Sequence, residues 1–350
     1  MDWTKQLLHW YSNNKRDFPW RNTRHPYSIW MSEIILQQTR TAQGLPYYER
    51  FMNAYPTVEK LAAAPLDEVL KLWQGLGYYS RARNLHATAQ QVVDQYDGVF
   101  PSHFKALKEL KGVGDYTASA IGSICFDLPE AVVDGNVYRL LSRCFGIFTP
   151  IDHSNAFKEF KTLANRLMDT QQPGTFNQAL MEFGAVLCTP KNPDCGRCPF
   201  QRQCVAFNQQ KIDQLPFKAK TTKVRKRYFN YLVVSDSNSH YLLQQRTAKD
   251  IWEQLFEFPL VETTQTIKSS SALQKTTAYQ ETFSEWNYPW KRWNPSPILH
   301  KLSHQQLYIT FWTIQLNTSL EEGMPWEQLT TKAVPVVIQN FIENFFLRTP

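Results

Sequence analysis

Two acidic residues of this sequence stand in settings that would move their pKa values in opposite directions. Glu33 has mostly apolar neighbours three and four positions away in the predicted helical stretch 29–39. Burial there would raise the pKa of its carboxyl and favour the protonated form that a general acid needs. Asp134 stands between the apolar run 131–133 and a predicted helix at 135–145. A cap carboxylate at that place accepts backbone N–H bonds and stays ionised.

This pair of carboxyl groups suits one class of reaction. A protonated acid beside an ionised carboxylate is typical of enzymes that cleave a glycosidic bond through a cationic sugar. Each residue also has an ordinary explanation, because Glu33 could lie at the wet edge of an apolar helix and Asp134 could be a helix cap alone. The pattern therefore makes the pair a candidate catalytic site and leaves the ordinary explanations open.

Four of the six cysteines lie within 17 residues, in the spacing C-x6-C-x2-C-x5-C: Cys188, Cys195, Cys198 and Cys204. A structural zinc site usually shows two short pairs, and only the middle two form one here. The wider single run favours a [4Fe–4S] cluster, with zinc or no metal as the alternatives. The two remaining cysteines, Cys125 and Cys144, lie on apolar helix faces and are expected to be core residues.

A glycine-rich turn lies between two predicted helices at 110–117. Gly112 and Gly114 would allow a tight turn and a close approach of the backbone. The helix that follows opens with unpaired amides, which can bind an anion such as a DNA phosphate, and Lys111 stands beside them. The full string between two amphipathic helices is similar to the helix–hairpin–helix motif of DNA-binding proteins.

The two parts of the chain differ in periodicity. The first 205 residues show helical spacing and no run of alternating strands; the predicted helices are 3–14, 28–43, 66–74, 78–95, 115–126, 135–145, 154–169 and 175–188. Ser28 could cap the second of these. After residue 227 we predict strands at 228–234, 241–243 and 307–314, a loop at 263–280 and a final helix at 334–347.

Composition bounds the class of protein. A hydrophobic share of 43% in 350 residues excludes wholesale disorder, and two domains are the first expectation. No apolar run approaches the roughly 18 residues of a membrane span, and the N-terminus has no secretory pattern. The net charge is +7, and residues 207–227 hold seven basic and one acidic side chain. Such a segment, with 223–227 at its end, suits nucleic acid or a solvated linker.

The residues together resemble a known family. The stretch 1–205, with its hairpin, the 133–136 segment and the four cysteines, is similar to the endonuclease III superfamily of DNA glycosylases. Within it the chain resembles MutY-type adenine DNA glycosylases, on the strings 19–21, 30–39, 65–70 and 73–84. The resemblance implies a multidomain chain, α then α+β. Residues 1–206 would form a helical glycosylase domain with the cluster loop at 188–204, 207–227 a basic linker, and 228–350 a Nudix-like α/β domain that recognises 8-oxoguanine.

The resemblance also implies a reaction, the removal of adenine mispaired with 8-oxoguanine or guanine in double-stranded DNA after the base has left the stack. Glu33 would protonate adenine, and Asp134 would stabilise the sugar cation or attack it. Tyr116 and Asn136 would complete the catalytic pocket, and Gln38 and Tyr78 would fill or wedge the gap near the flipped base. Bifunctional relatives carry a lysine nucleophile where this chain has Tyr116, so we predict a monofunctional enzyme.

The C-terminal half matches the family's second domain less uniformly. The segment 251–262 is similar to its signature, whereas the acidic array of active Nudix hydrolases is missing from 228–350. The domain is therefore expected to recognise DNA. Ser303 and His304 match the loop that reads 8-oxoguanine, and their side chains can supply hydrogen bonds to it. Leu302 stands where the family usually has phenylalanine.

Three alternatives compete with this interpretation: a pyrimidine-specific glycosylase with lyase activity, a catalytically idle iron–sulfur protein that binds DNA, and a nucleotide diphosphatase. The second domain, Tyr116 and the missing acidic array argue against the first and the last. We further expect a monomer in a bacterial cytoplasm, associated with the nucleoid and not with a membrane.

Overall fold

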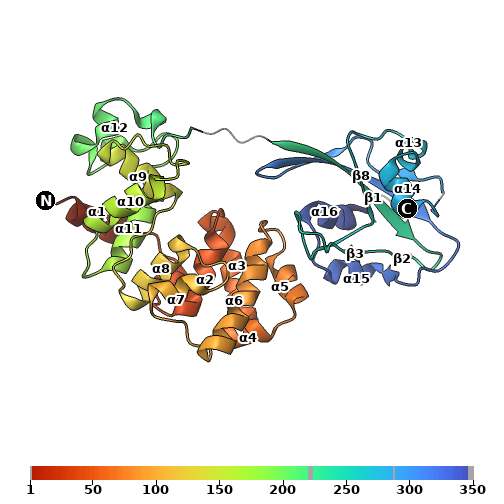
Figure 1. Cartoon of the computed structure of the whole chain (residues 1–350), viewed down its shortest axis with the longest axis horizontal. Coiled ribbons are helices and arrows are strands. Elements are labelled where there is room, and N and C mark those ends of the chain that lie inside the picture. Colours follow the sequence, from red (N-terminus) through yellow and green to blue (C-terminus); the bar gives the residue numbers. More distant parts are fainter. Residues whose placement is uncertain (1, 220–223, 287, 346–350) are drawn as a thin grey trace. The chain divides into compact units, whose positions relative to one another are not determined.

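The computed structural model describes residues 2–219, 224–286 and 288–345. The chain forms two compact units, Met1–Ala64 with Arg83–Thr221 and Pro65–Ala82 with Thr222–Pro350 (Figure 1). No helix among the described residues is long and apolar enough to cross a membrane. The segment 65–82 lies in the sequence of the helical half but packs with the second unit.

The first unit is helical. Its core is formed by α2, α8, α9 and α11, of which α2 packs on α8, and α11 packs on α1, α8 and α9. The helices are α1 (Trp3–Asn14), α2 (Pro26–Leu36), α3 (Thr41–Ala54), α4 (Val58–Ala63), α6 (Ser80–Tyr96), α7 (Phe104–Glu109), α8 (Asp115–Phe126), α9 (Gly135–Phe145), α10 (Ala156–Leu167), α11 (Pro173–Val186) and α12 (Val205–Asn208).

The predicted helix at 28–43 was wrong in its bounds. The chain breaks after Leu36, and Gln38 adopts a positive φ of 55° before α3 begins. Ser28 does not cap the helix, because α2 begins with Pro26 after the N-cap residue His25. Proline suits a first helical position, where its missing N–H has no partner to lose. The helix α4 and all of α3 beyond residue 43 were not predicted, whereas α7 is the helix expected before the hairpin, for which no range was given.

The second unit is built around two long parallel strands, β1 (Arg225–Ser235) and β8 (Gln305–Gln315). The main sheet has the order β6-β8-β1-β2-β9, with β5 on β1 and β7 on β8. Its other strands are β2 (His240–Tyr241), β5 (Leu260–Thr263), β6 (Lys291–Arg292), β7 (Ile298–Lys301) and β9 (Met324–Pro325), while β3 (Gln244–Gln245) and β4 (Phe256–Glu257) form a separate pair.

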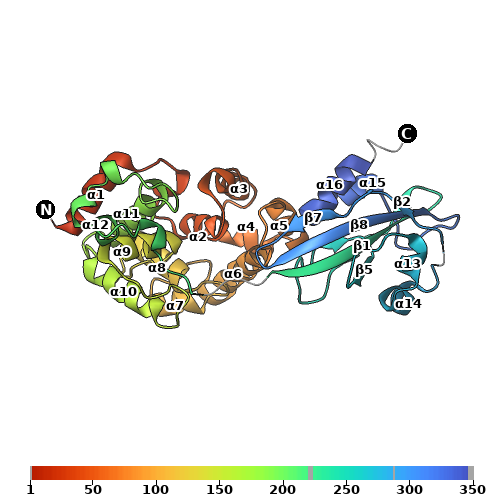
Figure 2. The same cartoon turned by 90° about the horizontal axis from the view of Figure 1, so that it is seen from above.

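Alternation along the strands gives this sheet two buried faces. Leu232 and Trp312 pack in a cluster with α13 (Ser270–Gln274) and α14 (Thr277–Phe283). On the other face, Phe311 stacks on Phe341 of α16 (Val336–Phe345), with ring centroids 4.1 Å apart. Figure 2 shows these two sets of helices on opposite sides of the sheet. The remaining helices of this unit are α5 (Leu66–Trp73) and α15 (Trp326–Thr331).

Two segments differ from the sequence prediction. The predicted loop 263–280 contains α13 and the start of α14, which the side chains of Ser269 and Thr276 cap. The predicted linker 207–227 carries structure at both ends, since residues 207–208 belong to α12 and residues 225–227 to β1. Between them, the Phe217 carbonyl accepts from the Ile151 amide at 2.9 Å. Residues 220–223 of that segment, including the first residue of the basic run, lie outside the described residues.

Candidate active site

Glu33 lies on α2 and lines a cavity of about 170 Å³ in the first unit. Its side chain is buried, and the hydroxyl of Tyr116 donates a hydrogen bond of 2.7 Å to its Oε2. Burial raises the pKa of Glu33 to about 7, with a further increase from the charge of Asp134, while the Tyr116 hydrogen bond and Arg21 act in the opposite direction. A carboxyl group with that pKa can hold a proton near neutral pH and give it up during a reaction.

Asp134 lines the same cavity from the N-terminus of α9. Its side chain accepts 2.8 Å hydrogen bonds from the Val137 amide and from Nδ2 of Asn136, as expected for a helix cap. Burial nevertheless raises the pKa of Asp134 above its ordinary value, while these hydrogen bonds and the charge of Arg139 oppose the increase. The sequence prediction considered only the effects that lower this pKa.

The two carboxyl groups therefore differ in how well their charges are stabilised. Glu33 has one hydrogen-bond donor, whereas Asp134 has donors on both oxygens at the positive end of a helix dipole. The charge of Asp134 raises the proton affinity of Glu33, so a single proton in the pair goes to Glu33, whose anion has fewer donors. This arrangement gives one acid and one ionised carboxylate in one cavity.

Asn136 connects Asp134 to the segment of the cysteine loop. Its Oδ1 accepts a 2.7 Å hydrogen bond from Nη2 of Arg139, and Nε of that buried arginine donates to the Cys188 carbonyl at 2.7 Å. Nη2 of Arg139 also donates to the Gly184 carbonyl on α11 at 2.6 Å. A Cβ atom at Gly184 would lie 2.7 Å from that of Asn136, so glycine is needed where α11 approaches α9.

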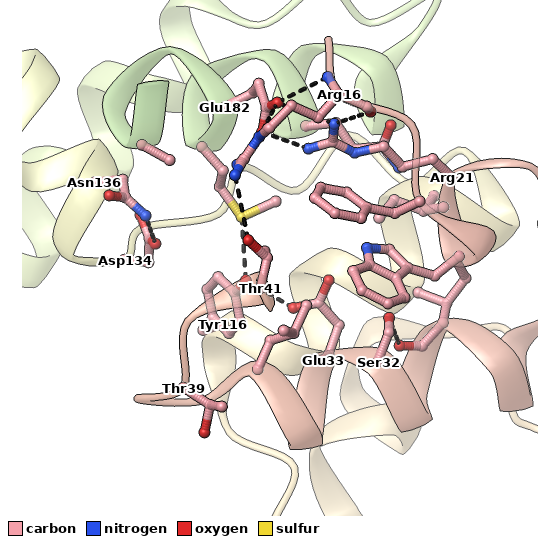
Figure 3. A pocket seen from close by; sticks show the side chains of 18 residues that line it. Arg16, Arg21, Ser32, Glu33, Thr39, Thr41, Tyr116, Asp134, Asn136 and Glu182 are labelled. Atoms are coloured by element: carbon pink, nitrogen blue, oxygen red, sulfur yellow. Dashed lines mark hydrogen bonds and ion pairs between the residues drawn. The ribbon is translucent and has the colours of Figure 1, made fainter. Parts of the chain in front are cut away.

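A second side of the cavity is formed by residues that the sequence prediction missed. Glu182, buried on α11, receives 2.8 Å hydrogen bonds from Nε and Nη2 of Arg16 and a 2.6 Å bond from Nη2 of Arg21 (Figure 3). Although burial raises the pKa of Glu182, these arginine hydrogen bonds lower it to about 2. A lone carboxylate in the apolar stretch 179–185 is the same signal that indicated Glu33, and it could have indicated this residue.

Figure 3 shows how the predicted catalytic residues are arranged. Glu33, Tyr116, Asp134 and Asn136 all line the one cavity, and Tyr116 also lies 3.1 Å from the Met181 sulfur. Gln38 and the hairpin residues do not line it. The catalytic set predicted from the sequence is thus brought together, with the arginine-bound Glu182 beside it.

The predicted hairpin lies between α7 and α8. Gly112 has a φ of +75°, and a Cβ there would lie 2.8 Å from that of Asn84. Both the backbone conformation and the lack of space therefore disfavour any other residue at this position. Lys111 is exposed, and its backbone is fixed by a 3.0 Å bond from its amide to Oε1 of Gln91. Gly114 is the N-cap residue of α8, with no side-chain cap. The exposed amides at this end suit a phosphate.

The four predicted ligand cysteines surround one small, largely apolar cavity: Cys188, Cys195, Cys198 and Cys204. Among residues 2–219, 224–286 and 288–345, no three His, Cys, Asp or Glu side chains lie close enough together to hold one metal ion. Four cysteine thiolates, one for each iron, are the usual ligands of a four-iron cluster, so the chemistry of the donor set fits that group.

An arginine also lies beside this loop. Nη1 of the buried Arg143 lies 3.5 Å from the Cys188 sulfur and donates a 2.8 Å bond to the Thr189 carbonyl. As expected, Cys144 is buried, and it also lines the cysteine cavity, whereas Cys125 is only half-buried. The positive guanidinium would offset the negative charge of bound thiolates.

Comparisons with known proteins bear on both units. The family described as "HhH-GPD superfamily base excision DNA repair protein" matches residues 31–166, and the family described as "NUDIX domain" matches residues 230–344. A solved structure of a thermostable thymine-DNA glycosylase is 32% identical, with a TM-score of 0.55, and covers 59% of this chain and 95% of its own. The Homo sapiens adenine DNA glycosylase is 44% identical over 218 residues, 60% of this chain and 40% of that protein.

An adenine DNA glycosylase of Buchnera aphidicola subsp. Schizaphis graminum is 32% identical over 348 residues, 97% of each chain. The chain belongs to the adenine DNA glycosylase family. It is a base excision repair enzyme that hydrolyses the N-glycosyl bond of adenine in DNA. The predicted order of a helical glycosylase domain and a Nudix-like domain is confirmed.

The remaining predicted residues of this adenine DNA glycosylase are exposed. Gln38 and Tyr78 have positive φ values of 55° and 49°. Such backbone conformations are uncommon for residues other than glycine and occur often at functional sites. Within the second unit, the hydroxyl of Tyr78 forms a hydrogen bond with that of Ser303. Ser303 and His304 lie in the turn between β7 and β8, where the His304 carbonyl accepts from the Arg225 amide at 2.9 Å.

The pKa of Glu33 predicts the alkaline limb of the pH profile. The single-turnover rate constant for adenine release should fall as pH rises through about 7, because Glu33 then loses its proton. Tyr116→Phe removes a hydrogen bond to the charged carboxylate, so the limb should move to higher pH. Tyr138→Phe, on α9 outside the cavity, is the matched control and should leave the limb in place. A limb that Tyr116→Phe leaves unmoved would contradict this assignment.

The Glu182 ion pairs predict a loss of stability in acid. Glu182→Gln should lower the free energy of unfolding at pH 7 by about 3 kcal/mol, because the half-buried arginines lose their partner. The lowered pKa of Glu182 stabilises the fold above pH 4.5, and this contribution is lost as pH falls toward 2. Denaturant titrations of both proteins should therefore converge in acid. Asp127→Asn, which breaks an exposed pair with Arg24, should have an effect below about 1 kcal/mol.

Proposed function

We propose that this chain removes adenine paired with 8-oxoguanine, or with guanine, from duplex DNA and does so without cutting the strand. The observation that carries the proposal is the shared cavity of Glu33 and Asp134, in which only one of the two carboxyl groups is well stabilised as an anion. A flipped adenine in this cavity would meet one proton donor and one negative charge.

The proposed reaction uses these two groups in sequence. Glu33 donates its proton to N7 of adenine, and the bond between N9 and C1′ breaks with its electron pair leaving on the base. The ionised Asp134 stabilises the cationic sugar. Water then adds to C1′, and its proton passes to the Glu33 carboxylate, which restores the starting state. Asn136 holds the Asp134 carboxylate in place during these steps.

The absence of a strand cut follows from the residue at the hairpin helix. Tyr116 donates a hydrogen bond to Glu33. By the resemblance to the wider superfamily, lyases carry a lysine at this position. A phenol bound to a carboxylate cannot form a Schiff base with the sugar. Lys111, the nearest lysine in the sequence, is exposed in the hairpin and does not line the cavity.

We assign recognition of the opposite base to the second unit. The exposed hydroxyl of Ser303 and imidazole of His304 can donate and accept hydrogen bonds in the turn before β8. The acidic side chains near β4 and β5 are bound to arginines instead of a metal–diphosphate: Arg246 lies 2.7 Å from Glu257, and Arg227 lies 2.6 Å from Glu262. This pairing argues against the nucleotide diphosphatase alternative.

We propose a [4Fe–4S] cluster in the loop 188–204, held by the four cysteines that surround the small cavity. When bound, it would cross-link the loop that receives the Arg139 and Arg143 hydrogen bonds. The cluster is not assigned a step in base release.

The direct experiment is single-turnover base release from a labelled duplex with adenine opposite 8-oxoguanine, with and without an alkali step. Strand breaks only after alkali would support a monofunctional adenine glycosylase, and breaks without alkali would favour the lyase alternative. Asp134→Asn should abolish release and retain DNA binding. Tight binding without release by the wild type would leave the idle DNA-binding alternative and overturn the proposal.

The assignment of Ser303 predicts a loss of opposite-base preference. Ser303→Ala should lower the ratio of the rates on 8-oxoguanine:adenine and guanine:adenine duplexes by about fivefold, because one hydrogen bond contributes about 1 kcal/mol. Ser237→Ala, in another exposed turn of the same unit, should keep the ratio of the wild type. An unchanged ratio in the first variant would place lesion recognition elsewhere.

The cluster proposal predicts the metal content. The purified protein should be brown and contain iron, and Cys198→Ser should lower both the visible absorbance and the iron per chain. Cys125→Ser is the matched control, because that thiol does not line the cysteine cavity. A colourless wild-type protein with bound zinc would refute the assignment.

A further inference from the structure

The last residues before Asp134 are buried, yet they belong to no helix or strand. In the segment 128–133, Ala131 and Val132 are completely buried, and Val133 is nearly so. Buried backbone amides and carbonyls need hydrogen-bond partners, which a neighbouring strand would ordinarily supply. Here side chains from α10 and α11 take the place of that strand.

Asn177 on α11 binds this segment at two points. Its Oδ1 accepts a 3.0 Å hydrogen bond from the Val132 amide, and its Nδ2 donates a 2.8 Å bond to the Glu130 carbonyl. The same Nδ2 lies 2.8 Å from Oγ of Ser123 on α8. Asn177 is completely buried, so no water competes for these bonds.

Two residues of α10 bind the segment at Ala131, between the two points that Asn177 binds. Oδ1 of Asn165 accepts from the Ala131 amide at 2.9 Å, and Nζ of Lys161 donates to the Ala131 carbonyl at 2.6 Å. Lys161 also donates to Oγ of Ser119 at 2.8 Å and pairs with Glu130 at 3.0 Å. These contacts fix both backbone groups of Ala131.

Both sets of contacts reach the same helix. Ser119 and Ser123 lie on α8, which begins one residue before Tyr116, and Tyr116 holds Glu33. The segment is therefore aligned against the helix that positions the proton donor, and it ends at Asp134 two residues after Val132. The cap bonds of Asp134 orient its carboxylate on α9 but do not by themselves fix it relative to α8.

We propose that Asn177, with Lys161 and Asn165, is a positioning residue that sets the place of Asp134 relative to Glu33 and Tyr116 through the segment 128–133, whose last three residues are buried. The three side chains bind the segment, and two of them also bind serines of α8. None of the three lines the cavity, so they act through Asp134. This inference rests on the proposed function of the two carboxyl groups. A displacement of about 1 Å in a catalytic group can cost about a hundredfold in rate.

The test compares Asn177→Leu with the wild type under single-turnover conditions, with enzyme in excess over a duplex carrying adenine opposite 8-oxoguanine. Leucine has a similar size and removes all three hydrogen bonds. The rate constant should fall between about tenfold and a hundredfold. The active fraction, titrated by the amplitude, should account for none of that fall, and binding of a non-cleavable duplex should remain.

The pH profile separates positioning from loss of folding. Glu33 faces Tyr116, Asp134 and Arg21, and the Asp134 charge raises its pKa while the other two lower it. If Asp134 moves away in Asn177→Leu, the alkaline limb of the rate profile should move to lower pH. A purely structural role would reduce the amplitude and leave both the rate constant and the limb at wild-type values, and that result would overturn the inference.

A matched control and a milder variant complete the design. Asn294 is a buried asparagine of the second unit that likewise accepts from an amide and donates to carbonyls, at Phe311, Ser296 and Ile309. Asn294→Leu should reduce stability but keep the rate constant per active molecule.

Lys161→Met is the second arm, since its ammonium is partly exposed and its loss threatens folding less. Lys161→Met should lower the rate constant and move the alkaline limb to lower pH, as Asn177→Leu does. A wild-type rate constant and limb in Lys161→Met would overturn the inference, even if Asn177→Leu failed to fold. The absence of release by the wild type would contradict the proposed function itself, whereas wild-type values in both variants would contradict only this inference.

Discussion

Two buried carboxyl groups line one small cavity, and this constraint shapes the rest of the helical unit. Two negative charges in such a place repel each other and lose hydration, so one group must hold a proton. The hydrogen bonds decide which one does, because Asp134 has donors on both oxygens and Glu33 has only Tyr116. Both arginines beside the cavity bind Glu182, and the charge of Arg21 lowers the pKa of Glu33 without outweighing burial.

The scaffold supplies this arrangement from helices that contact one another directly. α8 carries the phenol that binds Glu33, and it contacts both α2 and α11. α11 carries Glu182, approaches α9 closely at Gly184 and binds the buried segment before Asp134 through Asn177. From α9, Arg139 joins the Asn136 amide to the backbone of the cysteine loop. A chain of three hydrogen bonds of 2.7–2.8 Å therefore joins the cysteine loop to the Asp134 carboxylate.

The sequence predicted those features that depend on local patterns. Asp134 was expected to cap a helix, and the structure confirms the cap. The residue type and the apolar run beside it were enough to predict this cap. The position of Glu182 depends on arginines more than 160 residues away, which no local pattern shows. The raised pKa of Asp134 was also missed, because burial is a property of the packed fold. The short helices in 270–283 were missed because the capping bonds of Ser269 and Thr276 outweigh weak periodicity there. The break after Leu36 has no such cap, and the apolar spacing did not show it.

The central claim is that Glu33 is protonated near neutral pH while Asp134 is not. Infrared difference spectra of the free protein, recorded through a pH titration, report carboxyl protonation without relying on turnover. The account predicts a protonated-carboxyl band that disappears with a midpoint near pH 7 and is missing in Glu33→Gln. If the band titrates near pH 4, or if it persists in Glu33→Gln and disappears in Asp134→Asn, the assignment of acid and anion is contradicted.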